Sequence, residues 1–160
     1  MTFDSFVTQF RQTVERAATA LGRLDDAAAS RRRAPGKWSS KEVLGHLIDS
    51  ASNNHGRFVR AALTDDLLFQ GYDQDGWVAA QRYQDASWPD LINLWRAYNL
   101  ELARVMLAIP DEARRKPRAR HNLDQIAGQP VSPGQAATLD YFMRDYVRHM
   151  EHHLRQILPD

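Results

Sequence analysis

Three of the six histidines in this sequence fall in one short run near its C-terminal end, and histidine can bind metals or transfer protons near neutral pH. Successive residues of an α-helix are rotated by about 100°. If the run is helical, His149 and His153 lie one turn apart on the same face. His152 then points to the polar side. An i, i+4 pair of imidazoles can supply two ligands to Zn, Ni, Cu or Fe.

A further histidine, His46, lies in the segment 39–63, which also has helical periodicity. The apolar stripe of this segment lies about 100° to 160° from His46. Within about 80° of His46 lies a polar strip that is expected to face a cavity and that includes Asn53, Asn54 and Arg57. His46 therefore borders the core. One histidine from this helix and two from the last can hold a divalent metal and leave a position for water or substrate, as in catalytic zinc sites. Spacing alone leaves open the alternative that these are hydrogen-bonded core histidines.

Apolar residues at three- and four-residue steps predict four helices, over about 4–30, 39–63, 88–109 and 136–158. Ser39 and Glu42 form a capping box at the start of the second helix. Ser87 and Pro89 start the third, and Pro110 ends it. Two long connections, 64–86 and 111–135, separate the later helices, and the first is expected to contain a short helix near 77–83. The pattern predicts an all-α four-helix bundle with long crossover loops, forming a single domain over 1–160.

The composition excludes several classes of protein. The 160 residues include no cysteine, which excludes disulfides, thiolate metal sites and a cysteine nucleophile. The 21 basic and 20 acidic residues leave a net charge of +1, so no nucleic-acid partner is expected. No apolar run is long enough to span a membrane, and we recognise no signal peptide, so a cytoplasmic location is expected by default. The basic clusters at 31–33 and 114–120 are interpreted as solvated loop charge.

Two carboxylates lie within helical reach of the histidines. Asp49 follows His46 by three residues, and Asp145 precedes His149 by four. Each can either accept a hydrogen bond that orients an imidazole or form a surface ion pair. Arg57 can hold an anionic substrate group through its planar fork, and its alternative role is an inter-helix salt bridge.

The first long connection contains a second group of chemically capable residues, among them Tyr72, Asp73, Asp75 and Trp77. These residues can form the wall of a pocket, with Tyr72 or Asp73 as a proton donor or acceptor. Ordinary turn formation around Gly71 is the alternative. The side chain of Trp38 is expected to pack as a plug at the start of the second helix.

Several motifs occur together in an order that resembles the DinB-like (YfiT-like) superfamily. They are Lys37-Trp38-Ser39, the run from Val43 to Ser50 with His46 after a glycine, the run from Gly71 to Asp75, and His149-x3-His153 followed by Leu154-Arg155-Gln156-Ile157. The resemblance covers about 35–158. It implies a four-helix bundle that binds a divalent metal, Zn or Ni, through His46, His149 and His153.

The resemblance also suggests an activity. Members are similar to metal-dependent hydrolases or to S-transferases that use small cellular thiols. We therefore expect a metal-dependent enzyme acting on a small molecule, with Arg57, Tyr72 and Asp73 as catalytic candidates. A low-molecular-weight thiol is the candidate second substrate. The alternative is a non-catalytic protein that binds a metal or a small ligand, which a fourth protein ligand such as Asp73 would favour. Bundles of this kind often pair through helix faces, so a homodimer without a membrane partner is expected.

Overall fold

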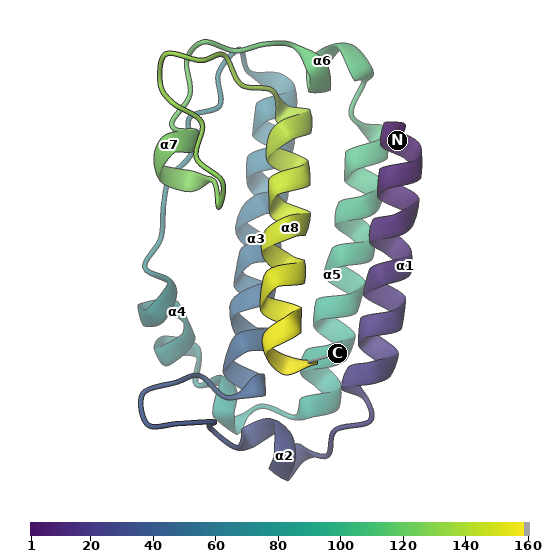
Figure 1. Ribbon diagram of the computed structural model, residues 1–160, viewed down its shortest axis with the longest axis vertical. Helices are drawn as coiled ribbons and strands as arrows, with labels where there is room; N and C mark the ends of the chain where they lie inside the picture. The colour runs from purple at the N-terminus through teal and green to yellow at the C-terminus, as the bar shows by residue number, and fades with distance from the viewer. Residues whose placement is uncertain (159–160) are drawn as a thin grey trace.

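Four long helices lie side by side in the computed structural model, which describes residues 1–158 (Figure 1). They are α1 (Phe3–Leu21), α3 (Ser40–Leu63), α5 (Trp88–Ala108) and α8 (Leu139–Ile157). Helix α5 packs against both α1 and α3, and α3 also packs against α8. The predicted four-helix bundle is confirmed.

The directions of the helices explain the two long connections. Helices α3 and α5 run parallel to each other and opposite to α1 and α8 (Figure 1). The segment 64–87 must therefore return along the length of the bundle, and it contains α4 (Gln74–Gln81) and η1 (Tyr83–Asp85). The segment 109–138 leads from the end of α5 to the start of α8 and contains α6 (Asp111–Arg115) and α7 (Leu123–Ile126).

The first helix is shorter than predicted. The periodic pattern suggested one helix over 4–30, but α1 ends at Leu21, where the backbone N–H of Gly22 bonds to the carbonyl of Ala18. Asp25 then starts a separate helix, α2 (Asp26–Ser30), by accepting a hydrogen bond from the amide of Ala28 at 2.7 Å. Apolar spacing continues across this turn, and the capping groups decide where each helix ends.

The boundaries of two other helices also depend on capping. Helix α8 begins at Leu139, three residues later than predicted, because Thr138 accepts a hydrogen bond from the amide of Tyr141. The short helix predicted near 77–83 is α4, which starts earlier, at Gln74. It ends before Arg82, whose φ of 50° is left-handed and cannot continue a right-handed helix.

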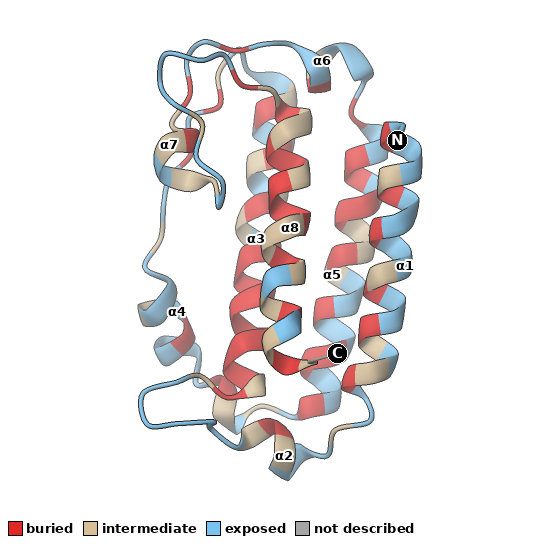
Figure 2. Cartoon of the chain, in the orientation of Figure 1, coloured by how far each residue is buried: buried red, intermediate tan, exposed pale blue. Residues whose placement is uncertain are grey.

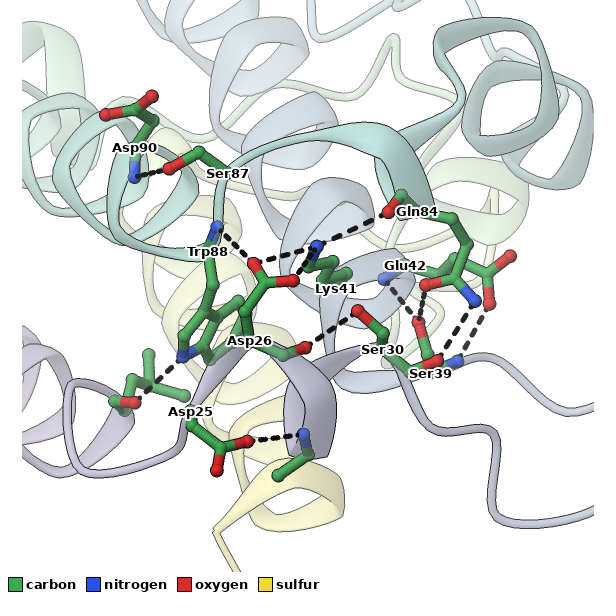
Figure 3. A network of polar contacts seen from close by, with 12 residues as sticks. Asp25, Asp26, Ser30, Ser39, Lys41, Glu42, Gln84, Ser87, Trp88 and Asp90 are labelled. Atoms are coloured by element: carbon green, nitrogen blue, oxygen red, sulfur yellow. Dashed lines mark hydrogen bonds and ion pairs between the residues drawn. The ribbon is translucent and has the colours of Figure 1, made fainter.

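A polar network fixes the start of α3 at one end of the bundle (Figure 3). The capping box of Ser39 and Glu42 is present as predicted. The amine of Lys41, whose side chain is buried, lies 3.0 Å from the carboxylate of Asp26 in α2 and 3.3 Å from the carbonyl of Gln84 in η1. Asp26 also accepts a hydrogen bond from the amide of Trp88. The network therefore joins α2, α3, η1 and α5.

Helix α3 is buried more completely than an amphipathic pattern predicts. All residues from 41 to 51 are buried (Figure 2), because α2, α4 and η1 cover parts of α3 that α5 and α8 leave open. Several of these residues are polar. Conversely, Leu94 fits the apolar spacing of α5 but is 49% exposed, and Ala62 of α3 is only partly buried.

Hydrogen bonds attach the two long connections to each other. The amide of Leu67 bonds to the carbonyl of Arg120 at 3.0 Å, and the amide of Asn122 bonds back to Leu67 at 3.2 Å. The Asn122 side chain accepts from the amide of Phe69 and donates to its carbonyl. The segments that follow, 70–74 and 123–128, are thereby held at fixed positions beside α3 and α8.

Gly45 provides a test of packing next to His46. A Cβ atom at Gly45 would lie 2.1 Å from the Tyr83 ring, whereas a Cβ at Gly56 of the same helix would contact nothing within 4 Å. We expect Gly45→Ala to destabilise the protein by about 1–3 kcal/mol through overpacking. The matched control Gly56→Ala should be neutral or stabilising by up to about 1 kcal/mol. Urea unfolding measures both, and equal stabilities for the two variants would contradict the packing of Tyr83 on α3.

Candidate metal centre

Three histidine side chains converge between α3 and α8. His46, His149 and His153 each offer a ring nitrogen, and these three atoms all lie within 4.8 Å of one another. The Nε2 atoms of His46 and His149 are 3.4 Å apart. His46 is fully buried, and the other two are partly buried. Within residues 1–158 no other histidine, aspartate or glutamate joins this group.

The three imidazoles are held in their neutral form. Burial, together with the neighbouring imidazoles, lowers the pKa of His46 to about 3 and the pKa of His149 to about 4. Burial likewise lowers the pKa of His153. Neutral rings keep the nitrogen lone pairs that a metal requires. The protein scaffold thus collects three uncharged nitrogen donors in one place.

The geometry passes a simple test of fit to a metal ion. Two nitrogens bound at about 2.0–2.1 Å to one tetrahedral zinc are about 3.3 Å apart, close to the separation of the His46 and His149 nitrogens. The Nδ1 atom of His46 is buried and has no hydrogen-bond partner among the described residues. If Nε2 of His46 binds the metal, this Nδ1 carries the ring proton, and the three nitrogens that face one another at the edge of the apolar core are the donor set.

Gln156 was not assigned a role from the sequence. Its Oε1 atom lies 3.2 Å from Nδ1 of His153. An amide oxygen only accepts hydrogen bonds, so Nδ1 carries the proton and Nε2 keeps its lone pair. Such an acceptor commonly orients a metal-binding histidine. The i, i+3 spacing from His153 on one helix was the available signal.

The two predicted carboxylates do not bond to the histidines. Asp49 is buried and accepts hydrogen bonds from Tyr83 at 2.6 Å and from Gln81 at 2.8 Å. Asp145 is also buried, not on the surface, and accepts from the backbone amides of Gly128 and Gln129, with Arg148 at 3.3 Å. Asp49 thus anchors the end of α4 and the η1 segment after it, and Asp145 anchors the segment that follows α7.

A pocket of about 280 Å³ adjoins the histidine cluster on the side of His149. Helices α3 and α8 form its floor, and the segments 71–74 and 125–128 form its walls. Figure 1 shows α4 and α7 on this side of α3 and α8, away from α1 and α5. Asn54 and Arg57, both expected to face a cavity, line this pocket, whereas Asn53 does not.

A second pocket, of about 410 Å³, adjoins the cluster on the side of His153. Its lining includes Lys37, Trp38 and Gln156. The ring of Trp38 is 5.2 Å from that of His46, centroid to centroid, and is half-buried. Trp38 therefore lies against the cluster at the start of α3, as predicted for a plug.

The residues of the first long connection have different surroundings. Tyr72 lines the pocket of about 280 Å³ and packs against Trp77. Burial, with a contribution from Asp49, raises the pKa of Tyr72 to about 12, so its hydroxyl is protonated at neutral pH. Asp73 caps α4 by accepting a hydrogen bond from the amide of Gly76, and it belongs neither to the histidine cluster nor to that pocket lining.

The fold and the cluster define an all-helical bundle with a group of three histidines that could hold a metal ion. A model of the DinB superfamily matches residues 9–157, and the chain belongs to this superfamily. A search of curated proteins finds no match.

The chain is also similar to a solved structure of YfiT from Bacillus subtilis, described as a probable metal-dependent hydrolase with an unusual four-helix bundle topology. The TM-score is 0.73 and the identity 17%, and the similarity covers 99% of this chain and 86% of that one. This likeness supports the fold. None of the helices in residues 1–158 has the length and apolar character needed to cross a membrane. The single domain, the homodimer and the cytoplasmic location stay predictions.

The paired histidines of α8 allow a matched test of the cluster. His149→Ala removes one of the three converging nitrogens and should abolish most Zn binding. His152→Ala changes an exposed ring outside the cluster and should leave it intact. Elemental analysis after purification measures both. If His152→Ala lost the metal and His149→Ala kept it, the orientation of α8 described above would be wrong.

Gln156 can be tested through the affinity of the same site. Loss of an oriented hydrogen bond to a ligating histidine typically costs about 10-fold to 100-fold in metal affinity, and we expect that loss for Gln156→Ala. Gln156→Glu keeps an acceptor and should retain tight binding. Competition with a fluorescent zinc chelator measures the affinities. Equal affinity of the parent protein and Gln156→Ala would remove Gln156 from the site.

Proposed function

We propose that this protein is a metal-dependent enzyme acting on a small molecule, with His46, His149 and His153 holding one divalent metal, Zn or Ni. The observation that supports this proposal best is that three neutral imidazoles lie together and that one of them, His149, lines a pocket of about 280 Å³. Catalytic sites with three protein ligands keep a position for water or substrate, whereas structural sites have four. The group of three without a carboxylate fits the catalytic type.

The chain's own groups suit hydrolysis of a small ester or amide. A bound metal of this type polarises a carbonyl and lowers the pKa of water or of a thiol. Tyr72 faces the same pocket as His149 with a protonated hydroxyl, so it can donate a hydrogen bond or proton to a leaving group, and it is not suited to act as a base. Arg57 lines the same pocket and can position a substrate. Asp73 caps α4 directly after Tyr72, and this cap can hold the Tyr72 backbone in place.

Group transfer between two small molecules is a second candidate function. The observation that favours it is the presence of two pockets that reach the cluster separately, one at His149 and one at His153. Hydrolysis needs one organic substrate, whereas transfer to a low-molecular-weight thiol needs two. The pocket at His153, with Lys37 and Trp38 in its lining, is the candidate place for the thiol.

Metal content and turnover together test the proposal. The purified protein should carry about one Zn or Ni per chain. It should turn over members of a panel of small esters, amides and thiol–electrophile pairs, and a chelator should abolish the activity until metal is restored. Tyr72→Phe should lower kcat with little change in metal content.

His152→Ala serves as the matched control and should match the parent protein in metal content and rate. Turnover that survives complete removal of the metal would refute a metal-dependent mechanism. A stoichiometric metal without turnover across the panel would instead favour a non-catalytic binding protein. Activity only with a thiol present would select transfer over hydrolysis.

A further inference from the structure

Arg57 carries a charge that no acidic side chain within residues 1–158 pairs with. Its guanidinium donates one hydrogen bond, from Nη2 to the carbonyl of Gln70 at 2.7 Å. A guanidinium has five N–H donors, so most of its capacity is unused in the described part of the chain. The inter-helix salt bridge considered from the sequence is absent there.

The surroundings of Arg57 hold it at the edge of the pocket beside His149. Its guanidinium carbon lies 5.9 Å from the ring centroids of both Phe69 and Tyr72. Partial burial lowers the pKa of Arg57, yet arginine stays protonated at physiological pH. A fixed cation that is partly removed from water gains more from an anionic partner than an exposed one.

A second, independent feature of the same pocket also lacks a partner. Asn54, one helical turn before Arg57, is 6% exposed and lines the pocket. Its amide nitrogen donates to the carbonyl of Ser50, whereas Oδ1 has no hydrogen-bond partner in the described structure. A buried acceptor without a donor costs about 1–3 kcal/mol. Because Oδ1 itself is closed to solvent in this structure, a ligand's donor meets it only after the Asn54 amide turns toward the cavity.

The negative charge in the pocket lining is already compensated. Asp145 is the one carboxylate among the lining residues, and both of its oxygens accept hydrogen bonds, from Gly128 and Gln129. Arg148 lies 3.3 Å from it as well. The unmatched groups in this pocket are therefore one cation, Arg57, and one acceptor, Asn54.

From this arrangement we infer that the pocket beside His149 binds small carboxylates that also carry a hydroxyl or amino group. The carboxylate pairs with the guanidinium of Arg57, and the hydroxyl or amino group donates to Oδ1 of Asn54. Phe142 and Tyr146 provide aromatic surface for the body of the molecule. The volume of about 280 Å³ limits this body to about one ring. The inference rests on the proposed function in one respect, since it takes this pocket to be the place where the substrate binds.

Calorimetry with two probes of the same shape tests the role of Arg57. We expect 3-hydroxybenzoate to bind and its neutral amide, 3-hydroxybenzamide, to bind about 10-fold to 100-fold more weakly, because a charge-assisted pair is lost. In Arg57→Gln the two probes should bind equally weakly. Arg60→Gln removes an exposed charge one turn further along α3 and should preserve the preference. A preference for the carboxylate that survives in Arg57→Gln would overturn the inference.

The measurements use both Zn-loaded protein and protein stripped with EDTA, so that this inference can fail separately from the proposed function. Binding through Arg57 does not need the metal and should be present in both forms. If stripped protein fails to bind 3-hydroxybenzoate while loaded protein binds it with or without Arg57, the carboxylate is held by the metal and the inference is wrong. The proposed function would then still stand.

The role of Asn54 and the folding of the variants need their own measurements. The parent protein should bind 3-hydroxybenzoate more tightly than benzoate, and Asn54→Ala should bind the two equally. A persistent difference would overturn the role of Asn54. If Arg57→Gln does not fold, the Nε–Hε NMR signal of Arg57 in the unaltered protein should shift on addition of 3-hydroxybenzoate and not of 3-hydroxybenzamide. An unchanged signal would overturn the inference.

Discussion

The contact between α3 and α8 at His46, His149 and His153 is the constraint on which the candidate site depends. It places polar rings where a bundle of this size would otherwise bury aliphatic side chains, and it removes their charge by desolvation. Such an arrangement persists only if the two helices keep one register, since a slip of one residue would turn the rings by about 100°. The capping box at Ser39 and the network around Lys41 fix one helix of the pair, and the cap at Thr138 fixes the start of the other.

The parallel course of α3 and α5 determines what covers this contact. The first connection has to travel back along the bundle, and it passes the open side of α3 as it does so. Pairing between Leu67 and the 120–122 segment, and the bonds of Asp145 to Gly128 and Gln129, bring the second connection to the same side. Helices α3 and α8 therefore form one side of the pocket beside His149, and the crossover segments 71–74 and 125–128 form the other side.

The sequence allowed the bundle, its long connections and the convergence of His46, His149 and His153 to be predicted, because each depends on periodicity within one helix or on motifs that resemble a known family. The exclusion of His152 followed from rotation angle alone. The break between α1 and α2 was missed because apolar spacing continues through Gly22 and Asp25. The complete burial of 41–51 was missed because it depends on α4 and η1, which are distant in sequence.

The same limit applies to individual site residues. The hydrogen bonds of Asp49 to Tyr83 and of Asp145 to Gly128 join residues that are far apart along the chain, so neither partner could be identified from spacing. Asp73 illustrates a second limit. A carboxylate before a short helix fits a cap as well as a catalytic acid, and the hydrogen bond from Gly76 that identifies Asp73 as a cap is a feature of the folded chain. Arg57 was expected to face a cavity, and it does. Its lack of an ion-pair partner in the described structure could not be predicted, because pairing depends on how side chains from different segments are arranged.

The division of labour between helices and crossovers has a consequence for engineering. The imidazoles come entirely from α3 and α8, whereas part of the pocket beside them comes from 71–74 and 125–128, which are stretches of backbone outside the long helices. Changing the composition of those two stretches would alter the walls of the pocket while the three histidines keep their places on α3 and α8. The architecture thus takes the histidine cluster and the walls of the adjoining pocket from different parts of the chain.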